Sequence, residues 1–133
     1  MTPEDTECKM FAQWLRIKKL RFTHISNETG FSMKDPKATM YVVVKKKSLG
    51  MSEGFPDYEI FIPKGTLYIE MKDPKKKLKK GNVMEDWKDG QKERGGLKRA
   101  QKEWIEYLQG RDHTESSVCY GAEEAIAFVE IFL

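Results

Sequence analysis

Two carboxylates and one lysine lie around a short turn in this sequence, at spacings that could support chemistry. Asp57 follows a proline directly before an apolar run, and Glu70 and Lys72 stand at the end of the next apolar run. The intervening Pro-Lys-Gly at residues 63–65 predicts an antiparallel β-hairpin. A two-residue turn at 63–64 places Asp57 opposite Glu70, whereas a turn one residue longer needs a bulge to bring them to the same face. Side chains two apart on a strand share a face, so Lys72 should lie beside Glu70.

This arrangement makes sense as a metal site. Two neighbouring carboxylates repel each other and raise each other's pKa, and a hard divalent cation such as Mg²⁺ relieves the repulsion while keeping several waters. The Met71 carbonyl could add another oxygen ligand. Lys72 could then orient or deprotonate a metal-bound water, or neutralise charge building on a phosphate, so that a phosphodiester is cut. The alternative is a structural cluster, because Asp after Pro is common in turns and Glu-x-Lys can be a surface ion pair.

The overall composition indicates one folded domain, residues 1–133. About a third of the residues are charged (34%), yet seven Phe, five Tyr and three Trp are more aromatics than a disordered chain carries. No apolar run reaches the roughly 18 residues that span a bilayer, and the acidic N-terminus lacks a signal-peptide apolar region. We therefore expect no membrane association and an intracellular location, most simply the cytoplasm of a bacterial or phage-infected cell. Cys8 and Cys119 form no CxxC pattern and are expected to be free thiols.

The positive charge is concentrated in one segment. From Lys72 to Lys102 there are twelve Lys and Arg against five Asp and Glu, a local charge of +7, so the rest of the chain carries −4 of the total +3. A basic segment beside an acidic remainder favours a polyanionic partner. A solvated lysine-rich surface is the alternative.

The remaining pattern alternates helices and strands. Thr2 and Pro3 form a good helix start, and Gly110 is a helix stop. Residues 37–48 stay open, because residues 41–44 favour a strand while Pro36 and Gly50 would bound a helix. The other expected elements are a helix at 3–20, strands at 21–26, 58–62 and 66–71, a helical turn near 83–87, a helix at 97–109, a strand at 116–121 and a helix from 122.

Pro56-Asp57 followed by Glu70-Met71-Lys72 resembles the PD-(D/E)xK nuclease signature. More specifically, "GMSEGFPD", "LYIEMK", "AQKEWIEYL", "VCYG" and "HISNETG" resemble the VRR-NUC (virus-type replication-repair nuclease) domain, stand-alone phage or bacterial type. The resemblance implies an α/β fold with a restriction-endonuclease-like core, a mixed central sheet flanked by helices. It also implies a structure-specific DNA endonuclease that depends on Mg²⁺ or Mn²⁺, cuts branched DNA such as four-way (Holliday) junctions and forms a homodimer. The alternatives are a DNA-binding module without catalysis and a nuclease for flaps or other nucleic-acid structures.

The same resemblance assigns roles to residues. Asp57 and Glu70 would bind metal and Lys72 would be the catalytic lysine. The family also uses a glutamate on the first helix; Glu7 matches it, because Glu7 lies in line with the apolar stripe of that helix, and Glu4 is the second choice. Gln101 matches a glutamine on the helix after the Glu-x-Lys strand. The family further suggests a helix over residues 37–48.

The long lysine-rich link after Lys72 departs from the family, in which this connection is often short. We expect it to bind phosphates beyond the cut site, which predicts steep salt dependence. His24 and Asn27 should lie near the site, although a lone strand histidine is more often structural. Trp87 could stack on an unpaired base or pin the segment to the body, and the second is slightly favoured. The candidate DNA-binding residues are Lys75, Lys76, Lys77, Lys79, Lys80, Lys98 and Arg99.

Overall fold

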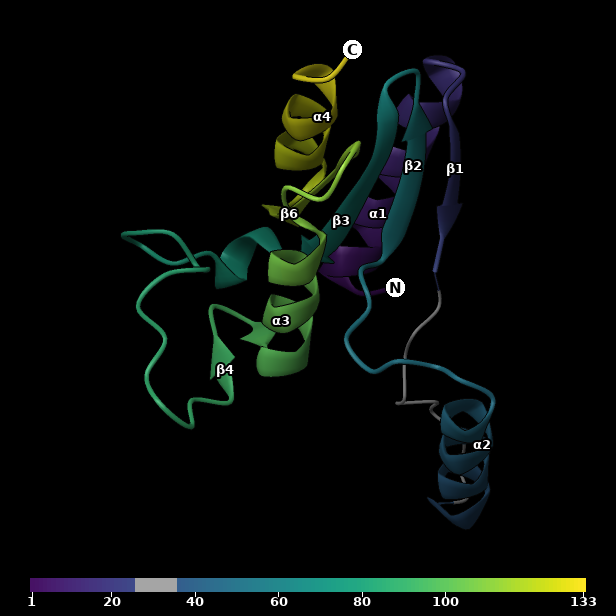
Figure 1. Ribbon diagram of the computed structural model, residues 1–133, viewed down its shortest axis with the longest axis vertical. Coiled ribbons are helices and arrows are strands. Elements are labelled where there is room, and N and C mark those ends of the chain that lie inside the picture. The colour runs from purple at the N-terminus through teal and green to yellow at the C-terminus, as the bar shows by residue number, and fades with distance from the viewer. Residues whose placement is uncertain (26–35) are drawn as a thin grey trace.

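The fold is a mixed four-stranded sheet flanked by helices (Figure 1). The computed structural model describes residues 1–25 and 36–133. The strand order is β1-β2-β3-β6; β2 is antiparallel to both β1 and β3, and β6 is parallel to β3. This confirms the expected α/β class. In chain order the elements are α1 (Pro3–Ile17), β1 (Arg21–His24), α2 (Pro36–Ser48), β2 (Tyr58–Ile62), β3 (Gly65–Lys72), the 3₁₀ turn η1 (Pro74–Lys76), β4 (Glu93–Arg94), β5 (Leu97–Lys98), α3 (Arg99–Leu108), β6 (Thr114–Tyr120) and α4 (Ala122–Glu130).

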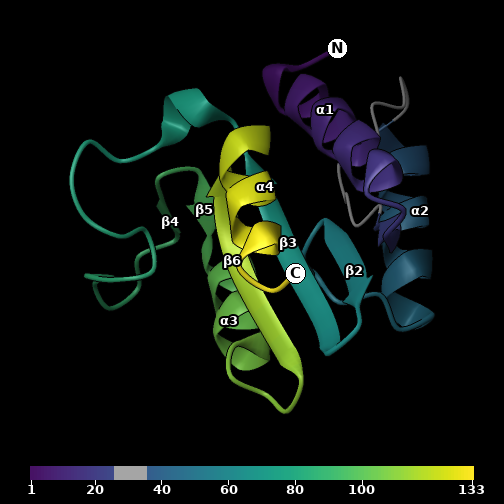
Figure 2. The ribbon, with the colours of Figure 1, turned by 90° about the horizontal axis from the view of Figure 1, so that it is seen from above.

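Helices cover both faces of the sheet. Figure 2 shows α4 over β3 and β6, with α3 on the opposite side. Successive side chains of β3 point to opposite faces of the sheet, and Leu67, Ile69 and Met71 point into the core formed with α1 and α4. Tyr68 and Glu70 point to the face on which α3 packs.

The first helix begins as the sequence predicts. The Thr2 hydroxyl accepts a hydrogen bond from the Asp5 N–H, and the Asp5 carboxylate accepts one from the Thr2 N–H, which is a capping box. Phe11 and Leu15 are fully buried and anchor α1 to the sheet. The cap fixes where the first turn of α1 lies, and this turn matters for the candidate site.

Residues 36–48 form helix α2, as the family resemblance suggested and against the strand preference of residues 41–44. Pro36 begins the helix, and N–H groups of Leu49 and Gly50 bond to the last-turn carbonyls of Lys45 and Lys47. In Figure 1 this helix extends away from the sheet and from the other helices.

The basic segment after β3 is folded rather than a free loop. Leu97 and Val83 pack with Tyr120 in a second, smaller core, and β4 pairs with β5. The expected helical turn near 83–87 is a non-helical turn, and Leu97 belongs to β5, so α3 begins at Arg99. Within the described ranges, no helix has both the length and the apolar character needed to cross a bilayer.

Candidate functional site

The chemistry-bearing residues meet at one end of the sheet, where β2 begins and β3 ends. Tyr58 pairs with Ile69 and Ile62 pairs with Gly65, which is the register of a two-residue turn. The residue before Tyr58 therefore stands opposite the residue after Ile69, so Asp57 faces Glu70. Because directly opposed residues of an antiparallel pair share a face, both carboxylates lie on the same side of the sheet.

Asp57 is held by the segment that precedes it. Gly54 has φ +84°, and a Cβ on it would lie 2.7 Å from the Ala100 carbonyl carbon, so only glycine lets this segment pack against the start of α3. Phe55 then packs edge-on against Tyr68 and Trp104, with ring centroids 5.6 and 4.9 Å away.

Two further contacts fix Asp57 itself. Its Oδ2 accepts a hydrogen bond of 2.7 Å from the Met71 N–H, and its carbonyl accepts one of 2.6 Å from the Ile25 N–H. The N–H and C=O of one strand residue point to the same side, so the Met71 carbonyl is also directed toward Asp57. The Asp57 carboxylate and the Met71 carbonyl are thus oxygen atoms on the same side of β3.

Glu70 and Lys72 are an ion pair almost excluded from water. Glu70 is 2% exposed and Lys72 7%, and the Lys72 Nζ lies 3.6 Å from the Glu70 Oε2. Burial raises the pKa of Glu70 well above its usual range, the Asp57 charge adds to the rise, and Lys72 opposes it. Replacing a buried ion pair by packed apolar residues is often neutral or stabilising, so stability alone does not explain this pair.

Glu4, in the first turn of α1, is the third carboxylate in this electrostatic group. Burial raises the pKa of Glu4. The charge of Lys72 acts to lower this pKa, and the charge of Asp57 acts to raise it. Glu4 in turn contributes to the raised pKa of Glu70. Three acids therefore influence one another around a single buried ammonium group.

Glu7, the first choice on α1, has a different partner. Its Oε1 accepts a hydrogen bond of 2.9 Å from the Ala122 N–H, the first residue of α4. Gly121 has φ +100°, and a Cβ there would lie 2.7 Å from the same Oε1. A carboxylate at a helix N-terminus satisfies a free N–H and favours the positive end of the helix dipole. Glu7 thus joins α1 to α4.

Gln101 is also engaged locally. Its Oε1 accepts a hydrogen bond of 2.9 Å from the Lys98 N–H and so closes the first turn of α3. The main chain of Gln101 lies beside Gly54, in the segment that leads to Asp57. The main chain of Gln101 therefore contacts the segment that holds Asp57, while the Gln101 side chain caps α3.

The candidate DNA-binding residues divide into two groups. Lys77 pairs with Glu124, and Arg99 donates to the carbonyls of Gln91 and Lys88 while stacking over the Trp87 ring. Their charges are thus partly used within the protein. The other five residues of the set, Lys75, Lys76, Lys79, Lys80 and Lys98, are exposed, as is Lys77.

Trp87 holds the basic segment together. Its indole N–H donates a hydrogen bond of 2.6 Å to the Val83 carbonyl, and Arg99 and Lys102 lie over its ring, 5.4 and 5.5 Å from the centroid. These contacts agree with the structural interpretation of Trp87.

The remaining candidates lie beside the site or outside the described chain. The His24 ring is exposed and contacts the Tyr58 ring at 4.9 Å, at the end of β1 nearest Asp57. Asn27 falls outside the described residues. Cys8 and Cys119 are free thiols, as expected, and burial raises the pKa of each to about 12.

The donor set suits a hard cation only in part. Within the described chain, no group of three or more His, Cys, Asp and Glu side chains stands ready to hold a metal ion. Asp57 and Glu70 supply two carboxylates with the Met71 carbonyl beside them, and Mg²⁺ is commonly bound through one or two carboxylates while it keeps several waters. Burial raises the pKa of Glu70 and the Asp57 charge adds to the rise, and a bound cation would lower this pKa. The residues therefore fit an ion held by a few protein oxygens and waters.

Comparison with known proteins adds no relative: no protein-family model, no curated protein and no solved structure matches the chain. The VRR-NUC resemblance therefore stays a prediction carried by the residues themselves.

Proposed function

We propose that this protein is a divalent-metal-dependent DNA endonuclease with a restriction-endonuclease-like core. The observation that carries the proposal is the convergence of Asp57, Glu70 and Lys72 on one face at one end of the sheet. A buried ammonium group beside two opposed carboxylates is costly for folding and useful for phosphodiester hydrolysis.

Each residue has a role in the proposed reaction. Asp57 and Glu70, with the Met71 carbonyl, would hold Mg²⁺ or Mn²⁺, which when bound supplies Lewis acidity and an activated water. Glu4, rather than Glu7, is the acid of α1 that we assign to the site, through its influence on Glu70. Lys72 donates hydrogen bonds to a phosphate oxygen and neutralises the charge that develops there during attack. The Met71 N–H keeps the Asp57 carboxylate in place.

The basic segment supports DNA as the substrate. Lys75 and Lys76 are exposed and lie in η1, shortly after the end of β3, so they can bind phosphates beside the cut bond close to Lys72. Each neutralised phosphate adds to the salt dependence of binding. Branched DNA, and a homodimer that cuts it symmetrically, follow from the family resemblance and belong to this proposal.

A panel of substrates tests the proposal. Labelled four-way junction, flap, duplex and single-stranded DNA would each be incubated with Mg²⁺, Mn²⁺ or EDTA. We expect metal-dependent cleavage, strongest on the junction, and none in EDTA. Cleavage of flap DNA alone would change the assigned substrate and leave the proposed metal-dependent hydrolysis in place. Binding to DNA without cleavage under any metal would favour the alternative, a DNA-binding module built on the exposed lysines.

A further inference from the structure

A hollow borders the outer edge of the sheet at β6. One edge of β6 pairs with β3, and the other pairs with no strand among the described residues. Figures 1 and 2 place the basic segment that follows β3 on this outer side of β6. Residues 77–84 of that segment, Gln109, β6 and the first turn of α4 line a hollow of about 330 Å³, which we call the edge hollow. Its size lies within the about 300–1,000 Å³ of small-molecule sites.

The main chain of β6 presents a donor and an acceptor to the edge hollow. The Tyr120 N–H donates a hydrogen bond of 3.0 Å to Glu124 of α4, so it points away from β3. The Ser116 carbonyl also points away, because it accepts one of 3.3 Å from the Gln109 side chain. Main-chain directions alternate along a strand, so Val118, midway between these residues, points its N–H and C=O to the same side. Val118 lines the edge hollow, and both groups therefore face it.

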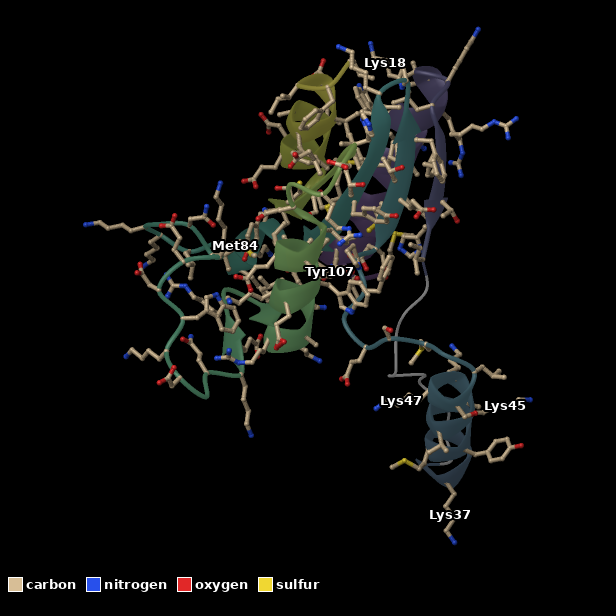
Figure 3. All side chains as sticks on the ribbon, viewed as in Figure 1. Lys18, Lys37, Lys45, Lys47, Met84 and Tyr107 are labelled. Carbon is tan, nitrogen blue, oxygen red and sulfur yellow. The ribbon has the colours of Figure 1, made fainter. Side chains whose placement is uncertain are left out.

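The walls of the edge hollow are apolar, and its charges are paired. Leu78, Val83 and Met84 come from the basic segment, and Figure 3 labels Met84 there. The charged residues of the lining are Lys77 and Glu124, which form an ion pair with each other. A group that enters the edge hollow should therefore be neutral rather than an anion.

Two exposed amide side chains add polar groups. The Asn82 Oδ1 accepts a hydrogen bond of 2.8 Å from the Met84 N–H, and the Gln109 Nε2 donates to the Ser116 carbonyl. The opposite ends of these amides are a donor on Asn82 and an acceptor on Gln109. Apolar walls with several neutral donors and acceptors match a nucleobase, which has apolar faces and a hydrogen-bonding edge.

The edge hollow lies one strand away from the proposed cutting site. In the parallel pair of β3 and β6, Glu70 is opposite Val118 and Lys72 is opposite Tyr120. Neighbouring strands are about 5 Å apart, so a nucleotide in the edge hollow would be close to a phosphate beside Lys72. The next residues after Leu78, Lys79 and Lys80, are exposed and can neutralise phosphates attached to such a base.

We propose that the edge hollow binds a nucleobase, that of an unpaired nucleotide next to the cut phosphate. The inference rests on the proposed function in taking DNA as the source of the base. Removing a base from the stack costs least where it is already unpaired, as it is at a bulge or a branch. Binding of the base would hold its strand, with the neighbouring phosphate, beside Lys72.

Binding measured in EDTA tests this inference without cleavage. Fluorescence anisotropy compares two labelled duplexes, one with a single unpaired deoxyadenosine and one with an abasic nucleotide at the same position. Met84→Trp places a large ring in the edge hollow, and Met10→Trp, at a 47% exposed position of α1, is the matched control. Gln109→Leu is a second variant, which removes an amide at an exposed position. Titration calorimetry with dAMP is the other arm, because a free nucleotide carries the same base.

We expect the unmodified protein and Met10→Trp to bind the duplex with the unpaired base at least about fivefold more tightly than the abasic duplex. Met84→Trp should lose this preference and Gln109→Leu should reduce it, while circular dichroism shows both variants folded. Binding of dAMP that Met84→Trp abolishes, without a preference between the duplexes, would support the nucleobase site with a free nucleotide as its source.

Two results would overturn the inference. The first is equal binding of the two duplexes together with no binding of dAMP, and the second is a preference that persists in both Met84→Trp and Gln109→Leu. Cleavage of DNA by a protein that shows no such preference would overturn this inference alone. A preference in a protein that cuts no DNA with any metal would overturn the nuclease proposal and support the nucleobase site.

Discussion

Replacing Glu70 by glutamine should stabilise the metal-free protein. The amide has the size of the carboxylate and Glu70 is 2% exposed, so the change removes a buried charge without leaving a cavity. Three terms set the magnitude: repulsion by Asp57, attraction by Lys72, and the loss of hydration by the carboxylate.

The attraction by Lys72 exceeds the repulsion by Asp57 by about 2 kcal/mol. At the 3.6 Å between Lys72 and Glu70, unit charges attract by about 5 kcal/mol at an effective dielectric constant of about 20. Opposed carboxylates about 5 Å apart repel by about 3 kcal/mol under the same assumption. Desolvation costs several kcal/mol per buried ion, so removing the charge should stabilise the protein by about 1–2 kcal/mol. For a chain of this size that raises Tm by about 4–8 °C.

The stability difference between wild type and Glu70→Gln should depend on pH. The pKa of Glu70 is raised in the folded state, so between its unfolded and folded pKa values the folded protein binds more protons. Wild-type stability should therefore fall relative to Glu70→Gln as the pH rises from about 4.5. Below that value the carboxyl is protonated in both states, and the two proteins should converge.

Urea unfolding in EDTA between pH 4 and 8 measures the difference. Glu59→Gln is the matched control, because Glu59 is a half-buried strand carboxylate with a neutral partner, the Tyr68 hydroxyl at 2.6 Å. This control should lower stability slightly and lack the pH-dependent gain. The reasoning is refuted if Glu70→Gln is less stable than wild type at pH 8, or if the difference does not grow with pH.

Three other predictions follow from the site and its supports. Glu4→Gln should lower metal-dependent cleavage at least about tenfold, and equal cleavage by this variant and wild type would remove Glu4 from the site. Glu7→Gln should cleave as wild type does. It should lower the free energy of unfolding in urea by about 1 kcal/mol, because it weakens a helix cap. Gly121→Ala should destabilise the fold by at least about 1 kcal/mol, since φ is +100° and the new Cβ meets Glu7, and an unchanged urea midpoint would contradict this. Four alanine substitutions in the basic segment should weaken DNA binding in fluorescence anisotropy and lower its salt slope by about 0.9 per lost phosphate contact, and an unchanged slope would place DNA elsewhere. The substituted residues are Lys75, Lys76, Lys79 and Lys80.

The hairpin was predictable because its determinants are local. Pro-Lys-Gly at residues 63–65 indicated the hairpin, but the sequence left the length of the turn open. The structure has the two-residue turn, which places Asp57 opposite Glu70. The capping box at Thr2 and Asp5 likewise depends on residues three apart. Signals of this kind are complete within a few residues of sequence.

The partner of Glu7 was not predictable in the same way. The stripe on α1 indicated that Glu7 lies at the edge of the inward face, and it is half-buried. Its hydrogen bond joins it to Ala122, 115 residues away, and depends on how α4 follows β6. The signal for Glu4 was present in the sequence, since the cap at Thr2 places it in the first turn, but nothing local favoured it over Glu7.

The helix at residues 36–48 shows the limit of propensity. Residues 41–44 favour a strand, yet Pro36 and the turn at Leu49–Gly50 bound a helix. The signals at the two ends of the segment decided that it is a helix, and they overrode the strand preference of its side chains.

The most direct test of the nuclease proposal compares Asp57→Asn with the unmodified protein in Mg²⁺. Asparagine can still accept the hydrogen bond from the Met71 N–H, so the fold is kept while one charged oxygen is lost. Asp73→Asn is the matched control, because Asp73 caps η1 through the Lys75 N–H and asparagine caps equally well. We predict that Asp57→Asn binds junction DNA as tightly or more tightly but no longer cuts it, while Asp73→Asn cuts normally. Cleavage by Asp57→Asn at the unmodified rate would contradict the account.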